Sequence, residues 1–306
     1  MLTIQVLIEN NLSPIACQSE EAQQKGPQPE RPRALIAEHG LSFWIEKNGH
    51  GLIFDTGKSG AFVGNAKQLG IDLVAAETLV VSHGHYDHGG GLRTLVETAH
   101  YRGQLWTGPG FFNPKWSNES PRPRYLGLDV DKTYLESRGI QCRELETPTP
   151  GSIHEILPGI FMLGNFIRTH IDETIAPRFT VERPRRGLPV ADDYRQFADD
   201  FADEICIVLD MPQGLVVLLG CAHPGLMNML DTAQQVFHKN LFAIFGGSHL
   251  VEADENRILA TRTYLKQSSA SLIALGHCTG PNAFAVLRQD LPALEPLYTG
   301  AQFHLE

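Results

Sequence analysis

The stretch VVSHGHYDHGGGL, from Val80 to Leu92, places four ionisable side chains within six residues and surrounds them with glycines. The four are His83, His85, Asp87 and His88. Imidazole nitrogen and carboxylate oxygen are the ligands that zinc and similar ions take in proteins. The alternative is a polar turn whose histidines bond to nearby backbone groups. Clustered histidine and aspartate directly after an apolar segment is typical of a metal site, so we expect all four to bind metal.

The spacing inside this histidine loop predicts two ions. Residues i and i+2 of an extended chain share a face, so His83 and His85 are expected to point the same way. Asp87 and His88 follow on the turn, where they can reach a second ion about 3.5–4 Å from the first. The glycines allow tight backbone conformations around the ligands. A helix expected at residues 91–99 adds positive potential at its amino end.

Further polar side chains follow other apolar, strand-like segments. They are Asp55, Cys221, His223, His249 and His277. Binding sites of α/β sheets gather at one end of the strands, so these residues are expected on the same rim as the histidine loop. His223 and His277 are predicted to be ligands, and His249 a substrate-side acid or hydrogen-bond donor. Asp55 is predicted to orient a ligand histidine, although each residue taken alone also fits a buried or turn position.

Strand and helix patterns alternate along the whole chain. Apolar, β-branched segments such as residues 41–48, 77–82 and 214–220 are followed by amphipathic ones such as residues 225–239 and 255–268. Strands that are apolar on both faces predict a layered α/β fold. Both halves run from strand-rich to helix-rich, which indicates one domain over residues 1–306 built of two similar lobes.

Three polar stretches interrupt this pattern, at residues 18–33, 109–125 and 172–203. The first is predicted to be a surface loop. The other two are longer than ordinary connections within a domain. We expect them to be loop insertions, either lids over the site or plain loops.

The composition is that of a globular protein with an acidic surface. The chain has 306 residues and a formal net charge of −10, and its one basic run, RPRRG at Arg183–Gly187, is too short for a nucleic-acid surface. We expect no membrane association, because no signal-peptide pattern and no apolar run of membrane length occur. Five scattered cysteines without a CxxC pair indicate free thiols and a cytoplasmic location. The oligomeric state is left open.

Four motifs give the chain a resemblance to the metallo-β-lactamase superfamily. They are FDTG (residues 54–57), SHGHYDHGGGL (82–92), GCAHPG (220–225) and GHCTG (276–280). Within the superfamily the chain is similar to the 7,8-dihydropterin-6-methyl-4-(β-D-ribofuranosyl)aminobenzene-5'-phosphate synthase family. This narrower resemblance is carried by EHGLSFWIE (residues 38–46), by Tyr86, and by GGSHL (246–250) between the last two motifs.

The resemblance implies a four-layer αββα sandwich with a metal site along one edge of its two sheets. It implies two divalent metal ions, with zinc as the first choice and iron or manganese as alternatives. His83, His85 and a third histidine would bind one ion. A bridging water or hydroxide would be the nucleophile. The ligands implied for the other ion are Asp87, His88 and His277.

One departure from the superfamily pattern leaves the third ligand of the first ion open. Cys221 stands where many relatives carry a bridging aspartate, and no histidine directly precedes residues 204–210. His223, Cys221, or one of Asp203 and Glu204 would complete the site. His85 stands where flavo-di-iron relatives carry glutamate, which favours hydrolytic or Lewis-acid chemistry over redox chemistry.

Three functions are compatible with these features. The preferred one is hydrolysis of a small, anionic ester, phosphodiester or lactone, in which Asp87 binds metal and guides a proton and His249 assists the leaving group. The second is the synthase condensation of a pterin precursor with an aminobenzene ribosyl phosphate. The third is a metal-stabilised binding protein without catalysis, which a closed ligand set would favour. Aromatic residues expected either to stack on a pterin or to anchor their loop are Phe111, Phe112, Trp116 and Tyr125.

Overall fold

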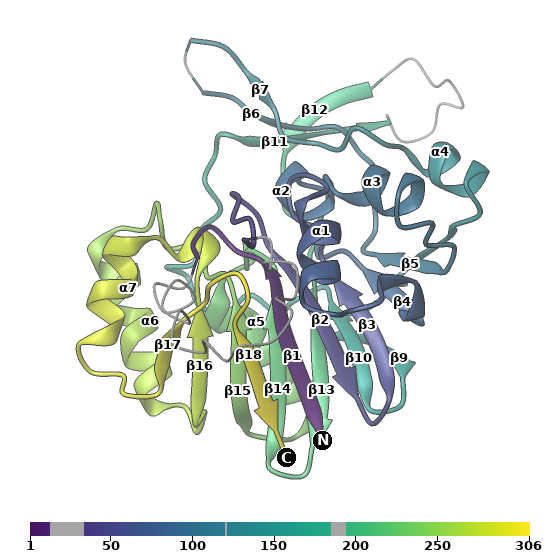
Figure 1. Cartoon of the computed structure of the whole chain (residues 1–306). Helices are drawn as coiled ribbons and strands as arrows, with labels where there is room; N and C mark the ends of the chain where they lie inside the picture. Colours follow the sequence, from purple (N-terminus) through teal and green to yellow (C-terminus); the bar gives the residue numbers. More distant parts are fainter. Residues whose placement is uncertain (13–33, 120, 185–193) are drawn as a thin grey trace.

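The computed structural model describes residues 1–12, 34–119, 121–184 and 194–306. The surface loop expected at residues 18–33 lies outside these ranges, as do residues 185–187 of the basic run. The protein is built around two seven-stranded sheets and one four-stranded sheet. The two large sheets pack face to face. Figure 1 shows both chain termini at the same end of them.

The first large sheet has the strand order β18-β1-β2-β3-β4-β5-β8. Its antiparallel strands β18, β1, β2 and β3 are followed by parallel pairs from β3 to β8. The carboxyl-terminal strand was not foreseen from the sequence, and it pairs with the first strand so that Leu2 lies opposite Leu305. The strands are β1 (Leu2–Ile8), β2 (Ser42–Lys47), β3 (His50–Phe54), β4 (Thr78–Val80), β5 (Gln104–Thr107), β8 (Gln141–Glu144) and β18 (Gln302–Leu305).

The second large sheet has the order β17-β16-β15-β14-β13-β10-β9. It repeats the plan of the first, with antiparallel pairs from β9 to β14 and parallel pairs from β14 to β17. The strands are β9 (Ser152–Leu157), β10 (Ile160–Gly164), β13 (Ile205–Met211), β14 (Gly214–Leu219), β15 (Leu241–Gly246), β16 (Leu272–Leu275) and β17 (Leu294–Pro296).

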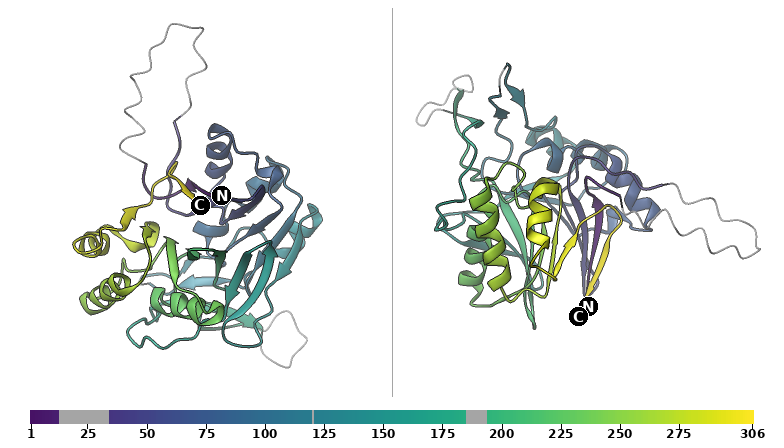
Figure 2. Two further views of the ribbon diagram at one scale, coloured as in Figure 1. Left: turned by 90° about the horizontal axis from the view of Figure 1, so that it is seen from below. Right: turned by 90° about the vertical axis from the view of Figure 1, so that its left-hand side faces the viewer.

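Helices cover the outer face of each large sheet. Figure 2 shows the blue and the yellow-green helices on opposite sides of the sheets, so the layers run αββα as predicted. The helices of the first sheet are α1 (Ala61–Gln68), α2 (Tyr86–Gly89), α3 (Leu92–Glu97) and α4 (Lys132–Ser137), with the 3-10 turn η2 (Leu73–Ala75). The second sheet carries α5 (Leu226–Phe237), α6 (Glu255–Gln267) and α7 (Pro281–Arg288), with the 3-10 turn η3 (His277–Thr279).

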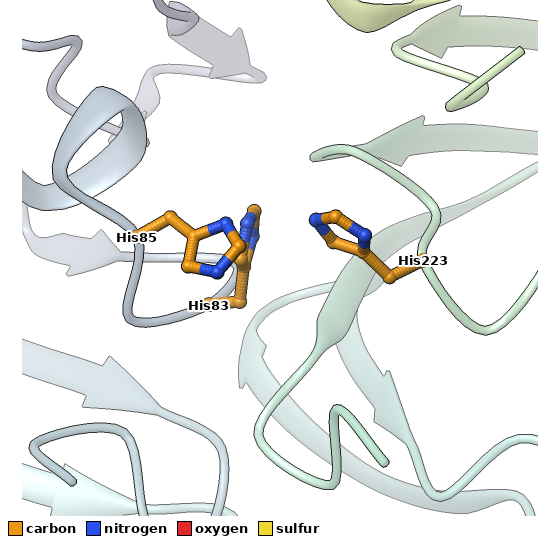
Figure 3. A group of neighbouring side chains, drawn as sticks. All are labelled: His83, His85 and His223. Atoms are coloured by element: carbon orange, nitrogen blue, oxygen red, sulfur yellow. The ribbon is translucent and has the colours of Figure 1, made fainter. Parts of the chain in front are cut away.

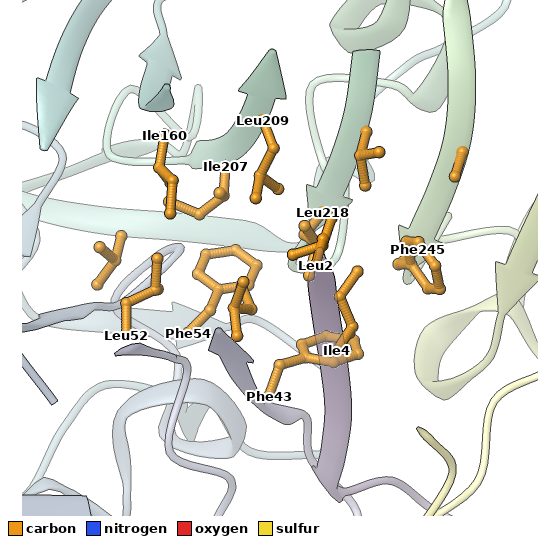
Figure 4. Packing of buried hydrophobic residues seen from close by; sticks show 14 of the residues in the cluster. Leu2, Ile4, Phe43, Leu52, Phe54, Ile160, Ile207, Leu209, Leu218 and Phe245 are labelled. Atoms are coloured by element: carbon orange, nitrogen blue, oxygen red, sulfur yellow. The ribbon is translucent and has the colours of Figure 1, made fainter. Parts of the chain in front are cut away.

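Alternation along the strands explains why they are apolar on both faces. In β3, Leu52 and Phe54 belong to the core between the sheets, whereas Ile53 packs under the helices. In β13, Ile207 faces the other sheet and Val208 faces the helices. Successive side chains of a strand point to opposite faces. Both faces of each large sheet are therefore buried, as Figure 4 shows for the core between them.

The two stretches expected as irregular loops instead pair with each other. They form a small sheet of order β12-β11-β6-β7, which we call the cap sheet. It consists of two antiparallel strand pairs, and the pairing that joins them is between residues more than 60 positions apart, which no local pattern reveals. Figure 1 shows the cap sheet above the end of the sandwich that carries α2. Its strands are β6 (Lys115–Ser117), β7 (Arg124–Tyr125), β11 (Phe179–Pro184) and β12 (Tyr194–Ala198).

None of the helices in the described ranges is both long enough and apolar enough to cross a membrane.

The core between the sheets predicts a large difference between two phenylalanines. Phe54 is fully buried there and stacks on Phe43 with ring centroids 6.3 Å apart. Phe54→Ala should lower the free energy of unfolding by about 3–5 kcal/mol, through lost burial and a residual cavity. Phe197 on the cap sheet is 47% exposed, and Phe197→Ala should cost less than about 1 kcal/mol. Urea denaturation of both variants checks this, and equal losses would contradict the assignment of the core.

Candidate metal centre

Side chains from both large sheets meet at one end of the sandwich. The histidine loop follows β4, and His85 is the residue immediately before α2. His223 follows β14 of the other sheet, and His277 follows β16. Figure 3 shows His83 and His85 on one side and His223 on the other, with the three rings pointing toward one another.

Three of these imidazoles share an unusual feature, because their Nε2 atoms are buried and have no hydrogen-bond partner in the described chain. They belong to His83, His85 and His223. Ring centroids are 4.7 Å apart for His83 and His85, and 5.0 Å and 5.2 Å from these rings to that of His223. An unpaired buried polar atom is costly. A metal ion bound to all three nitrogens would satisfy them, and one nitrogen from each ring lies within 4.8 Å of the others.

The charge state of these three histidines also suits metal binding. Burial lowers the pKa of His83, His85 and His223 well below the usual value for histidine. Each imidazole is therefore neutral near pH 7. A neutral imidazole offers the nitrogen lone pair that a metal ion requires.

A second group of possible ligand atoms lies beside the first. His88 Nε2 is 3.2 Å from His277 Nε2, and His277 Nε2 is 3.5 Å from Asp87 Oδ2. Ligand atoms at bond lengths of about 2.1 Å around one tetrahedral ion lie about 3.4 Å apart. Cys221 Sγ approaches the same group, at 3.1 Å from His88 Nε2. These atoms do not all converge on one point, since Asp87 groups with His39 and His277, and Cys221 groups either with His83 and His88 or with His277 and Cys278. Each of these groups of three offers ligand atoms for a second ion.

Asp55 orients the histidine loop through hydrogen bonds. Its carboxylate accepts from His88 Nδ1 at 2.6 Å and from the backbone amide and hydroxyl of Ser82 at 2.7 and 2.9 Å. The Ser82 hydroxyl also lies 3.0 Å from His83 Nδ1. Burial lowers the pKa of His88, but the charge and hydrogen bond of Asp55 outweigh it and raise the pKa to about 9. A metal ion on Nε2 would replace that proton.

Asp203 and Glu204, which the sequence offered as substitute ligands, bond instead to backbone amides. Asp203 Oδ2 accepts from the amide of Gly84 at 2.8 Å. Glu204 accepts from the amides of Ala222 and His223 at 2.6 and 2.9 Å. Both carboxylates therefore fix the loops that carry the histidines. Neither belongs to a group of converging ligand atoms in the described chain.

Four residues that follow strands at this edge have left-handed backbone conformations although none is glycine. Their φ angles are 62° at Asp55, 61° at Ala222, 45° at His249 and 51° at His277. Each such residue costs about 1–3 kcal/mol, and such residues cluster at functional sites. The sequence gives no sign of these conformations, because they depend on the tertiary packing.

A cavity of about 360 Å³ opens onto these side chains. Asp87, His223 and His277 line its floor, and Arg178 and Phe179 of the cap sheet region line its wall. The aromatic residues expected to stack on a pterin do not line it, whereas Tyr86 does. A larger cavity of about 840 Å³ lies elsewhere, between the open edges of the two large sheets.

His249 lies on the wall of the 360 Å³ cavity beside His223, with ring centroids 4.2 Å apart. Burial lowers the pKa of His249 to about 4. Its ring is therefore neutral near pH 7 and is placed to donate one hydrogen bond toward the cavity. The sequence predicts His249 as either an acid or a hydrogen-bond donor, and a neutral ring at this position fits the donor better.

Three residues near the centre were not assigned a role from the sequence. His39 Nε2 is 3.1 Å from Asp87 Oδ2. Asn10 Oδ1 is 3.1 Å from His277 Nδ1, which leaves His277 Nε2 free to face the centre. The ring of Phe201 stacks on that of His223, with centroids 3.8 Å apart and planes at 15°. They follow no ligand-like spacing, so only the folded chain brings them to the site.

Comparisons with known proteins agree with this geometry. The sequence model of the Metallo-beta-lactamase superfamily matches residues 35–154. The 7,8-dihydropterin-6-methyl-4-(beta-D-ribofuranosyl)-aminobenzene-5'-phosphate synthase of Methanocaldococcus jannaschii is 30% identical over 86% of this chain and 89% of its own length. An uncharacterized protein of the same organism is 24% identical over 84% of this chain and 90% of its own length.

A solved structure agrees over the whole length of the chain. It is a metal-dependent hydrolase of the beta-lactamase superfamily, 26% identical, with a TM-score of 0.79 over 100% of this chain and 99% of its own. A family model, a relative and a solved structure thus lead to the same conclusion as the histidine loop and the αββα layers. The chain belongs to the metallo-β-lactamase superfamily and, within it, to the family of the dihydropterin-ribofuranosylaminobenzene phosphate synthase.

Proposed function

We propose that this protein is a metal-dependent hydrolase with two divalent metal ions, acting on a small, anionic ester or phosphodiester. The observation that carries the proposal is the convergence of three buried imidazole nitrogens that have no other partner in the described chain. His83, His85 and His223 would hold the first ion. Asp87, His88 and His277 would hold the second. Zinc suits nitrogen and carboxylate ligands of this kind, and iron is the alternative.

Bound ions would supply Lewis-acid chemistry, lowering the pKa of water toward about 7 and polarising the scissile group. The chain's own residues would position and protonate. Asp87 bonds to His39 at the cavity floor, where it can accept a proton from water. His249 can donate a hydrogen bond to the leaving group. Phe179 and Phe201 pack around the histidines and exclude bulk water from one side of the centre.

An anionic substrate is favoured by two arginines that line the cavity. Arg178 and Arg124 both line the cavity. The Arg178 guanidinium lies 4.1 Å from the centre of the Phe179 ring, and it pairs with Glu119 and Glu252. Arginine in a fixed position is well suited to bind a phosphate or carboxylate. The cavity volume of about 360 Å³ suits a small molecule.

A synthase-type condensation is the second candidate, and one observation favours it. The relative that is 30% identical over most of the chain is named a synthase. The same two ions would act as Lewis acids, and Tyr86 and Phe179 on the cavity wall would stack on a flat ring. A substrate panel separates the candidates, because a hydrolase cleaves an activated ester without a second substrate.

The role of Asp87 predicts a loss of turnover. Asp87→Asn removes a ligand oxygen charge and the proton acceptor, and should lower kcat for an activated chromogenic phosphodiester by about 10²–10⁴-fold. Asp129→Asn is the matched control, because Asp129 is exposed and pairs with Arg93 on the surface, and it should leave kcat unchanged. A wild-type protein that binds metal but cleaves none of a panel of phosphate, phosphodiester and lactone esters would contradict the hydrolase assignment.

The role of Asp55 predicts a loss of metal affinity. Asp55→Asn keeps the size of the side chain but removes the charge that holds His88 and Ser82, so zinc affinity should fall by about 10–100-fold. Titration of the metal-free protein by calorimetry measures this. Asp72→Asn, at the exposed start of η2, serves as the control. Unchanged zinc affinity in Asp55→Asn would show that this carboxylate has no part in orienting the ligands.

A further inference from the structure

Two thiols lie on the wall of the cavity that also contains the histidines. They belong to Cys221, which follows β14, and Cys278, which lies in η3. Both side chains are buried, with 3% and 8% of their surface exposed. The sequence left the role of Cys221 open and gave none to Cys278. The other described cysteines, Cys142 and Cys206, do not line this cavity.

The sulfur atoms lie among possible ligand atoms of the second ion. Cys221 Sγ is 3.1 Å from His88 Nε2. The two sulfurs and one nitrogen of His277 all lie within 4.8 Å of one another. A second group of converging ligand atoms contains Cys221 with His83 and His88. Cys221 thus belongs both to the group with His83 and His88 and to the group with His277 and Cys278. Cys278 belongs only to the latter group.

The backbone on both strand ends is shaped to present these sulfurs. Ala222 has a φ of 61° and His277 a φ of 51°. These left-handed residues turn the chain so that neighbouring ligand-type residues line one cavity: Cys221 with His223 on one loop, and His277 with Cys278 on the other. The strain at these two positions is accounted for if both members of each pair are needed at the centre.

Cys278 Sγ has hydrogen-bond partners and space beside it. The backbone amide of His249 donates to Cys278 Sγ at 3.3 Å. The Cys278 thiol itself donates to the backbone carbonyl of Cys221 at 3.4 Å. A Cβ atom on Gly247 would lie only 2.5 Å from Cys278 Sγ, so glycine at this position leaves the space that the sulfur occupies. The turn after β15 thus supplies a hydrogen-bond donor to the Cys278 thiol, and its glycine leaves room for the sulfur.

We propose that Cys221 and Cys278 bind the second metal ion through sulfur, together with His277. This inference rests on the proposed dinuclear centre and adds a chemical difference between its two sites. The first site offers three imidazole nitrogens, whereas the second offers two sulfurs and the His277 nitrogen. Soft thiolate ligands select zinc, iron or cadmium over magnesium, calcium or manganese. We therefore expect the second site to discriminate among metal ions more strongly than the first.

Absorption spectroscopy of the full-length protein tests the inference without reference to activity. The metal-free, reduced protein is titrated with Co²⁺ and, separately, with Cd²⁺, and the near-ultraviolet band of sulfur-to-metal charge transfer is followed. The wild type should have developed this band by the time two equivalents of metal are bound. Cys221→Ser and Cys278→Ser should each lose about half of its intensity, because each thiolate contributes its own transition, and the double variant should lose it entirely.

Cys142→Ser is the matched control, since Cys142 lies on the edge strand β8 away from the site, and it should keep the full band. Two bound ions without a sulfur band in the wild type would overturn this inference and leave the proposed hydrolase intact. Full intensity in Cys278→Ser would also overturn it, because only one sulfur would then bind. A wild type that binds no metal at all would overturn both this inference and the proposed function.

Discussion

Buried imidazole nitrogens lie where the strand ends of the two large sheets meet, and the rest of the site depends on a partner that satisfies them. Three Nε2 atoms in the described chain face one another without a partner, and each costs about 1–3 kcal/mol if nothing binds it. Residues in the turns that follow several strands adopt left-handed conformations at the same edge, at a further cost. The two apolar layers under the helices and the core between the sheets supply the stability that sustains this arrangement. A bound metal ion would satisfy these nitrogens, so that they would stabilise the folded state instead of destabilising it.

The cap sheet is joined to the candidate metal centre by a buried ion cluster. Lys115 of β6 donates to Asp199 and to Asp203, each at 2.9 Å, and all three side chains are nearly inaccessible to solvent. Burial lowers the pKa of Lys115, but the two carboxylates outweigh it and raise the pKa above the usual value. Asp203 also accepts the amide of Gly84 inside the histidine loop. Removing one partner of such a cluster leaves a buried charge unpaired, so the position of the cap and that of the loop are linked.

Much of the fold followed from the sequence because its signals are local. The apolar strands, the helices α5 and α6 and the glycine-flanked histidine loop are each recognisable within a short window. The αββα layers were expected from the resemblance to the metallo-β-lactamase superfamily, and they are confirmed. The cap sheet was not, because β6 and β11 find each other across more than 60 residues, with Phe179 opposite Ser117. The carboxyl-terminal strand β18 escaped for the same reason, since its partner β1 is at the other end of the chain.

The residues of the candidate site also fall into two groups, those that a local sequence pattern identifies and those that only the fold brings together. Residues at ligand spacing, such as His83 and His85, could be selected from the sequence alone. His39, Asn10 and Phe201 could not, because their relation to the centre exists only in three dimensions. Asp203 and Glu204 were selected as alternative ligands from their place before β13, yet their oxygens bond to the backbone of Gly84 and His223. The type of residue was informative, but the direction of its side chain depended on turns that the sequence did not specify.

We infer that two metal ions lie side by side where the strand ends of the two sheets meet. Anomalous X-ray diffraction from crystals of the natively purified protein, recorded on both sides of the metal absorption edge, measures this directly. We expect two peaks about 3.5–4 Å apart. One should lie among the Nε2 atoms of His83, His85 and His223, and the other beside His88 and His277. The absence of any peak between these histidines, in crystals that diffract well enough to show their rings, would contradict it.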